Sequence, residues 1–443
     1  MHWPELISSI DQMLERLFPI TRSLTGEGNR LTLKMLQEIV PIRLLEYPSG
    51  TKAYDWVIPN EWNIKEAWIK DAKGNKLIDF NACNLHVVGY SEPVNKTISF
   101  SELSNNLHRL GDESDAIPYR TTYYKKDWGF CVTGKQYERL MKAKGPLDVF
   151  IDSTMDSHGS LTAGEFLLSG KSKEEYFVST YFCHPSMAND NLSGLILTVF
   201  LARIMADAYI PLEKSWRFIF VPETIGAISY LKHNEASMKA MKGGFVASCC
   251  GGPGRFGYKE TFLGDHLIDR AIRLVFRDSG IDSIRYSFSP DGSDERQYSS
   301  PGFRIPTATI SKDKYYEFPE YHTSLDNLGF VNGDQIAETL KLYLGAVEIL
   351  DKNKTYRSTM QFCEPQLGRR GLYPDIGGGY RVDSDSPDKN AEIHDEVNII
   401  SWILFLADGS CDLVTIAERS GIAFKLIQRL SNKLFRHGLL EIM

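Results

Sequence analysis

The chain has 443 residues, of which 42% are hydrophobic and 24% charged, and its formal net charge is −7 at pH 7. A chain of this length exceeds one ordinary hydrophobic core, so we expect two or three domains. The acidic balance gives the whole protein no electrostatic reason to bind nucleic acid, and no stretch approaches the ~20 apolar residues that a membrane span requires.

Two amphipathic helices are predicted first, followed by a β-rich segment. Apolar residues recur at helical spacing over residues 6–18 and 28–39. From 43 to 139 the pattern changes to short, partly alternating runs separated by turn residues, as at 55–59 and 85–90. We therefore predict a small β-rich domain at 43–139, inserted after two helices that belong to the next domain.

Strand-like and helix-like runs alternate in the middle of the chain. This alternation is typical of a layered α/β domain with a largely parallel or mixed sheet. We expect that domain to be discontinuous, formed by residues 1–42 and 140–362. Its predicted strands are 148–152, 176–182, 215–221, 244–248 and 306–310, and its predicted helices are 192–207, 227–234, 267–279 and 334–350.

A segment rich in Gly, Pro and Asp at 363–389 is typical of a linker. It is followed by three short helical runs and a final apolar run, a succession that predicts a winged-helix domain at 390–443. The expected helices and closing strand are 397–406, 412–419, 423–437 and 438–442.

Basic residues on the last predicted helix could meet DNA phosphates in the manner of a recognition helix. Acidic residues such as Asp412 and Glu418 dilute this charge. We therefore favour a winged helix used for packing or dimerisation over one that binds nucleic acid, and a homo-oligomer remains open. The basic residues are Lys425, Arg429, Lys433, Arg436 and His437.

His184 and Asp190 lie where the strand predicted at 176–182 gives way to the helix predicted at 192–207. Functional groups in open α/β sheets gather at the carboxyl ends of strands. An imidazole and a carboxylate six residues apart on such a turn could bind one metal ion. The alternative is a plain turn in which Asp190 caps the helix.

Further polar residues follow later strands. Glu223 comes just after a predicted strand, where a carboxylate is well placed to act as a general base on water activated by a metal. His322 could be a third metal ligand, oriented through its other ring nitrogen. Asp294 could support the site or contact substrate, and Arg296 could bind a carboxylate. A solvated loop residue is the alternative for each.

Taken together, these segments resemble the zinc aminopeptidases of the M28 type. They are more similar still to bacterial proteins whose aminopeptidase-like domain is interrupted by a small β insertion and followed by a winged helix. The resemblance implies that His184, Asp190 and His322 are zinc ligands, with Asp190 in the bridging position, and that Glu223 is the general base. The matching stretches, in order, are His184 with 190–194, 222–226, Tyr321-His322-Thr323 with Asp326, and, more weakly, 292–294. Tyr321 joins Asp294 and Arg296 as a residue that could contact substrate.

Two departures from this family pattern concern the metal content. Thr224 stands where the family has a second, metal-binding glutamate, and 248–252 lacks the acidic ligand expected on the next strand end. We therefore predict one zinc ion in preference to two, because three protein ligands plus water are the usual catalytic arrangement. Cys249 or Cys250 could replace the lost carboxylate, but packing is the commoner role of such residues.

The leading hypothesis is a zinc-dependent hydrolase that cleaves a peptide or small amide near a free amino end. One alternative is a catalytically inactive, peptidase-like protein that binds a ligand and uses the winged helix as its output. Another is an amidohydrolase acting on a modified sugar or small metabolite. The seven cysteines contain no CxxC pair and no signal peptide is visible, so we expect a cytoplasmic protein without disulfides and without a membrane partner.

Overall fold

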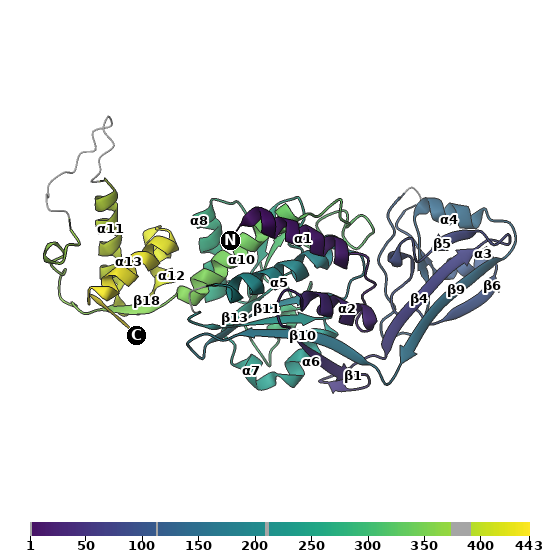
Figure 1. Ribbon diagram of the computed structural model, residues 1–443, viewed down its shortest axis with the longest axis horizontal. Helices are drawn as coiled ribbons and strands as arrows, with labels where there is room; N and C mark the ends of the chain where they lie inside the picture. The colour runs from purple at the N-terminus through teal and green to yellow at the C-terminus, as the bar shows by residue number, and fades with distance from the viewer. Residues whose placement is uncertain (1, 112–113, 209–211, 374–390) are drawn as a thin grey trace, which may run out of the picture. The chain divides into compact units, whose positions relative to one another are not determined.

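The computed structural model describes residues 2–111, 114–208, 212–373 and 391–443, with side chains from 396 onward in the last range (Figure 1). Its contacts divide the chain into two compact units. Unit 1 comprises Met1–Gly264 and Ser283–Tyr343, and unit 2 comprises Asp265–Asp282 and Leu344–Met443. Among the described residues, no helix is long and apolar enough to span a bilayer.

Unit 1 is built around an eight-stranded mixed sheet with the order β1-β10-β12-β11-β13-β16-β14-β15. Strand β11 lies in its centre, parallel to β12 on one side and to β13 on the other. Its sequence EYFVSTY is buried at all but the first position, as expected for a strand covered on both faces. The strands are β1 (Arg43–Pro48), β10 (Ser160–Leu168), β11 (Glu175–Tyr181), β12 (Ser215–Val221), β13 (Gly243–Val246), β14 (Phe256–Lys259), β15 (Ile284–Tyr286) and β16 (Thr307–Lys312).

Helices cover both faces of this sheet. Figure 1 shows α1 and α5 on one face and α6 and α7 on the other. Helix α5 is buried almost all round because it packs between the sheet and α1. The helices are α1 (Trp3–Leu17), α2 (Glu27–Leu36), α5 (Gly194–Ala206), α6 (Ile225–His233), α7 (Glu235–Lys239), α9 (Glu295–Tyr298) and α10 (Gly333–Lys352), whose last residues belong to unit 2.

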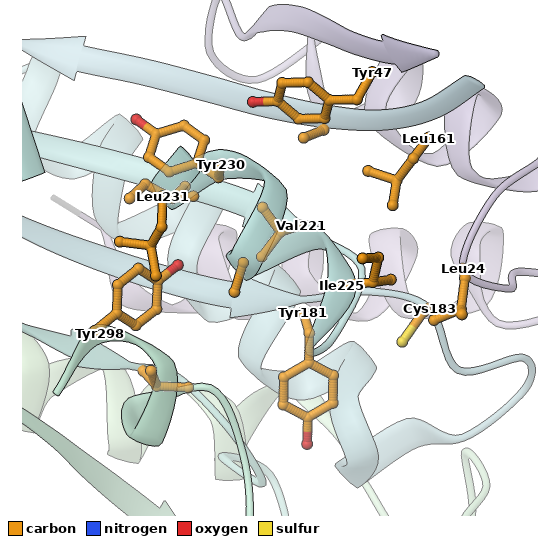
Figure 2. Packing of buried hydrophobic residues seen from close by; sticks show 14 of the residues in the cluster. Leu24, Tyr47, Leu161, Tyr181, Cys183, Val221, Ile225, Tyr230, Leu231 and Tyr298 are labelled. Atoms are coloured by element: carbon orange, nitrogen blue, oxygen red, sulfur yellow. The ribbon is translucent and has the colours of Figure 1, made fainter. Parts of the chain in front are cut away.

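A large hydrophobic cluster joins β11, β12 and α6. Figure 2 shows Tyr181, Val221 and Tyr230 within it, together with Cys183 just past the end of β11. The layered α/β fold predicted from the alternation of strands and helices is therefore confirmed. The cluster extends past the end of β11 to Cys183, and the next residue is His184.

A second, four-stranded sheet of unit 1 has the order β5-β4-β9-β6. We call residues 61–156, which contain it, the inserted module. Its strands are β4 (Glu61–Lys70), β5 (Lys76–Asp79), β6 (Val94–Ile98) and β9 (Leu147–Asp156), and its other elements are α3 (Phe100–Leu103), α4 (Gly134–Met141), β7 (Leu107–His108) and β8 (Phe130–Cys131), while the hairpin of β2 (Lys52–Ala53) and β3 (Trp56–Val57) precedes it.

Three assignments made from the sequence were wrong. Strand β9 pairs with β4 and β6 in the inserted module, not with the α/β sheet. Strand β1, expected in the β-rich domain, pairs with β10 in the large sheet. Residues 85–90, read as a strand, contain a 3-10 turn at Asn84–His86. An alternation of apolar residues predicts a strand but not its neighbour in the sheet, because strand pairing joins segments that are far apart in the sequence.

Unit 2 contains the predicted helices and closing strand of the tail. The side chains of Ile427, Leu430 and Leu434 on α13 are buried, and Asp412 caps α12 by accepting the Thr415 N–H at 2.7 Å. The elements are α8 (Leu267–Ser279), α11 (Ala391–Leu406), α12 (Leu413–Ser420), α13 (Phe424–Arg436), β17 (Thr355–Ser358), β18 (Asp408–Asp412) and β19 (Leu440–Ile442), and the strands form a sheet in the order β18-β17-β19.

Helix α8 was expected in the α/β domain but its contacts assign it to unit 2. The side chain of Arg270 reaches Glu418 on α12 with a nitrogen–oxygen distance of 2.6 Å. Of the linker predicted at 363–389, residues 374–389 lie outside the described residues.

Candidate metal centre

The segment between β11 and α5 crosses the carboxyl end of the sheet, where sites in open α/β folds are found. His184 and Asp190 in this segment are 5% and 1% exposed. The carboxylate of Asp326 holds the segment in place, because it accepts the backbone N–H of Asn189 at 2.6 Å and that of Asp190 at 2.9 Å. These bonds replace the regular backbone pairing that the segment lacks.

Three potential ligand side chains converge here. Atoms of His184, Asp190 and His322 lie within 4.8 Å of one another. Oδ1 of Asp190 accepts a hydrogen bond from the Tyr181 hydroxyl, whereas Oδ2 faces the ring of His322. That second oxygen lies 2.9 Å from Nε2 of His322. Two imidazoles and a carboxylate oxygen facing one point are the donor set of a metal site.

The protonation states of two of these groups suit a metal. Burial lowers the pKa of His184 to about 4, which keeps this imidazole neutral at pH 7. Burial alone would raise the pKa of Asp190, but the neighbouring His184 and His322 lower it to about 2. Metal ligands must be unprotonated, so at neutral pH both residues are in the form that a cation requires.

Glu223 lies at the edge of this cluster, just beyond β12. Its Oε2 is 3.9 Å from Nε2 of His184, and its Oε1 accepts a hydrogen bond of 2.9 Å from the Ser293 hydroxyl. Its backbone N–H donates to Sγ of Cys183 at 3.3 Å. Burial raises the pKa of Glu223 well above its usual value, and the negative charges of Asp294 and Asp190 add to this effect.

Asp294 and Arg296 contact the residue that follows Glu223. Oδ1 of Asp294 accepts the Thr224 N–H at 2.8 Å, and Arg296 lies 3.3 Å from the Thr224 hydroxyl. Thr224 needs this support, since its φ of +62° is rarely adopted by a β-branched residue. Burial raises the pKa of Asp294 to about 7. Tyr321 stacks on the His322 ring with centroids 3.9 Å apart.

The departures noted in the sequence have structural consequences. Ser248 is hydrogen-bonded to the Tyr181 hydroxyl at 2.8 Å, and Cys249 is buried with Tyr315 and Phe318. Within the described part of the chain, neither Cys249 nor Cys250 joins a group of converging ligand atoms. Cys183 does, together with His184 and Glu223.

Two residues close to the centre were not anticipated. Arg22 is 2% exposed and donates to the carbonyl oxygens of His184 at 3.0 Å and Leu17 at 2.6 Å. The ring of Tyr119 lies 5.1 Å from the ring of His184 and 5.3 Å from that of His322, measured between centroids. Neither residue belongs to a local motif, because each reaches the centre through folding of a distant segment.

Comparison with known proteins places this geometry in context. Residues 11–353 match a family described as a domain of unknown function, DUF4910, and residues 354–442 match a winged helix-turn-helix family. A protein of Clostridium acetobutylicum, named as a candidate polysaccharide biosynthesis protein with an aminopeptidase-like domain, is 42% identical over 434 residues. The match covers 98% of this chain and 96% of that protein.

Solved structures show the same architecture. A crystal structure of a candidate peptidase from Clostridium acetobutylicum has a TM-score of 0.90 and 40% identity, covering 99% of this chain and 97% of the other. The zinc aminopeptidase BSAP from Bacillus subtilis has a TM-score of 0.58 at 15% identity, covering 78% and 94% respectively. The expected aminopeptidase-like fold is therefore confirmed. The chain belongs to the DUF4910 family, and its DUF4910 region is followed by a winged helix-turn-helix.

Proposed function

We propose that this protein is a zinc-dependent hydrolase that cleaves an amide or peptide bond with Glu223 as general base. The observation that carries the proposal is the convergence of His184, Asp190 and His322, whose potential ligand atoms lie within 4.8 Å of one another. Glu223 lies beside this cluster, 3.9 Å from His184.

The donor set fits zinc. Two imidazole nitrogens and one carboxylate oxygen leave a fourth position open, as catalytic zinc sites do. When bound, zinc would polarise the scissile carbonyl and make water a stronger acid. We favour one ion over two, because Thr224 and the 248–250 segment supply no further carboxylate.

Glu223 is suited to hold and move a proton at Oε2. Ser293 occupies Oε1, so Oε2 is the carboxylate oxygen nearer to His184. The raised pKa of Glu223, caused first by burial, favours retention of a proton that it takes from water. The same proton can then be given to the departing amine.

The substrate is proposed as a peptide or a small amide. The name of the Clostridium acetobutylicum relative, which mentions polysaccharide biosynthesis, supports a second candidate, an amide carried on a sugar. Both substrates need the same hydrolytic groups, and they differ only in what surrounds the cleaved bond.

The experiment is to purify the full chain without chelators, measure its zinc content, and assay a panel of aminoacyl anilides and N-acyl amino sugars. His322→Ala should lose zinc, whereas Glu223→Gln should keep zinc and lose about 10²–10⁴-fold in turnover. The exposed residues His158 and Glu348 provide matched controls, His158→Ala and Glu348→Gln. A parent protein that cannot be loaded with zinc would instead support the inactive, ligand-binding alternative, and full turnover by Glu223→Gln would refute the mechanism.

For the winged helix we propose a role in packing or self-association rather than in DNA binding. Glu396 lies 3.2 Å from Arg429 and 2.9 Å from Lys433, so two basic side chains of α13 are already paired within unit 2. Retention of the full chain on duplex DNA at low salt, lost as salt rises, would contradict this proposal. We also propose a cytoplasmic location, which cell fractionation can test.

A further inference from the structure

A short segment of the inserted module lies against the loop that carries His322. The Tyr119 N–H donates to the His322 carbonyl oxygen at 2.8 Å, and the Ser324 N–H donates to the Ile117 carbonyl oxygen at 2.9 Å. In addition, the Ile117 N–H donates to the Ser324 hydroxyl at 3.0 Å. Pro118 and Thr323 face each other in an antiparallel bridge. Residues 117–119 thus pair with 322–324 as two short strands would.

His322 depends on this support more than the other two ligand candidates do. Its side chain is 32% exposed, whereas that of Asp190 is 1% exposed. Its φ is +55°, in the left-handed region, and it belongs to no helix or strand. A residue in this conformation persists only where its surroundings hold it there. The hydrogen bond from Tyr119 acts directly on the His322 backbone.

The Tyr119 ring adds a second restraint. It stands edge-on to both imidazoles, at 5.1 Å from His184 and 5.3 Å from His322. Among the ring contacts described, it is the one side chain of the inserted module that reaches both histidines. Because protein interiors are close-packed, this ring limits how far either imidazole can turn.

Tyr119 is itself held on its other side. Its hydroxyl is hydrogen-bonded to that of Tyr123 at 2.8 Å, and the Tyr123 ring packs edge-on against Tyr90 at 5.4 Å. The Tyr90 hydroxyl reaches that of Thr25 at 2.7 Å. A chain of contacts therefore runs from the segment before α2, through the inserted module, to His322.

We propose that residues 117–119 of the inserted module position His322 for metal binding, which makes the module a structural part of the site. The inference rests on the proposed function, since it assumes that His322 is a ligand. Groups that orient a ligating histidine typically change metal affinity 10–100-fold when they are removed. Tyr119 and Ser324 are thus positioning residues, and their effect should be visible in zinc affinity itself.

The test is the zinc affinity of the full chain, measured by competition with a chromophoric chelator. Tyr119→Ala removes the ring, and Ser324→Ala removes the acceptor of the Ile117 N–H, so each should weaken zinc binding about tenfold or more. Tyr119→Phe keeps the ring and the backbone donor and should stay within about threefold of the parent. Tyr124→Ala alters an exposed ring of the same module and should leave affinity unchanged.

Hydrogen exchange of the metal-free proteins supplies a second readout. The amides of 322–324 should exchange faster in Tyr119→Ala and Ser324→Ala than in the parent, while thermal unfolding shows that the variants remain folded. Folded Tyr119→Ala and Ser324→Ala proteins that bind zinc within twofold of the parent would overturn the inference and leave the proposed function standing. A parent that binds no zinc would overturn both.

Discussion

Replacing Asp326 should release the segment that carries Asp190. The Asp326 side chain is fully buried, and its two oxygens accept the N–H groups of Asn189 and Asp190 at 2.6 and 2.9 Å. Asp326→Ala leaves both buried donors without their acceptor, at a cost of about 1–3 kcal/mol for each. Removing a buried negative charge that lies near Asp190 offsets part of this cost. We therefore expect a net loss of roughly 2–4 kcal/mol in the free energy of unfolding.

Asp326→Asn is the informative companion to this change. The asparagine amide retains one acceptor oxygen but turns its N–H₂ group toward the second backbone donor. Asp326→Asn should therefore restore less than half of the free energy of unfolding that Asp326→Ala loses. Stability should be measured by urea unfolding of metal-free protein, because bound zinc would add its own contribution. Hydrogen exchange at Asn189 and Asp190 localises the effect. Asp55→Ala, at an exposed position, is the control.

The outcome that refutes the reasoning is specific. Suppose that the free energy of unfolding of Asp326→Ala lies within about 0.5 kcal/mol of the parent value, and that the amides of Asn189 and Asp190 stay protected from hydrogen exchange. The carboxylate of Asp326 then does not hold the segment. In that case the position of Asp190 would have to come from packing around α5 alone.

The remaining predictions concern two arginine contacts, a partly buried one of Arg30 and a buried one of Arg22. Hydrogen bonds from Arg30 and from the Ser160 N–H outweigh the opposing effect of burial and lower the pKa of Glu61 from 4.5 to about 2. This shift corresponds to at most about 3 kcal/mol of stabilisation of the folded state. Because the folded pKa lies below the unfolded value, this stabilisation is present above about pH 4.5 and is lost as the pH falls toward 2. Glu61→Gln should therefore lower the free energy of unfolding at pH 7 by roughly 1–3 kcal/mol and flatten its dependence between those pH values; an unchanged acid limb in urea titrations would contradict this. Arg22→Met should cost roughly 1–3 kcal/mol in the same assay, because the buried carbonyls of His184 and Leu17 lose their charged donor. Arg22→Met with parental stability would show that the apolar side chain compensates for the lost bonds.

The local sequence determined many of the helices and strands, and it identified two of the candidate ligands of the metal centre. The run EYFVSTY predicts a buried strand because β-branched and aromatic residues fill it, and β11 is that strand. The helical spacing of the tail likewise predicts α12 and α13, which form at the expected positions. His184 and Asp190 could be selected as candidates because they follow a core strand, where side chains face the edge of the sheet.

Only the tertiary structure decided which strands pair and which distant residues reach the centre. The apolar residues of β9 are compatible with either sheet. Its pairing with β4 and β6 depends on packing within the inserted module. Arg22 and Tyr119 each lie more than 60 residues from His184 along the chain. In the folded protein, Arg22 donates to the His184 carbonyl oxygen and the Tyr119 ring packs against the His184 ring. Periodicity and turn residues report on neighbours in the sequence, whereas close packing and hydrogen bonds between remote segments are settled when the whole chain folds.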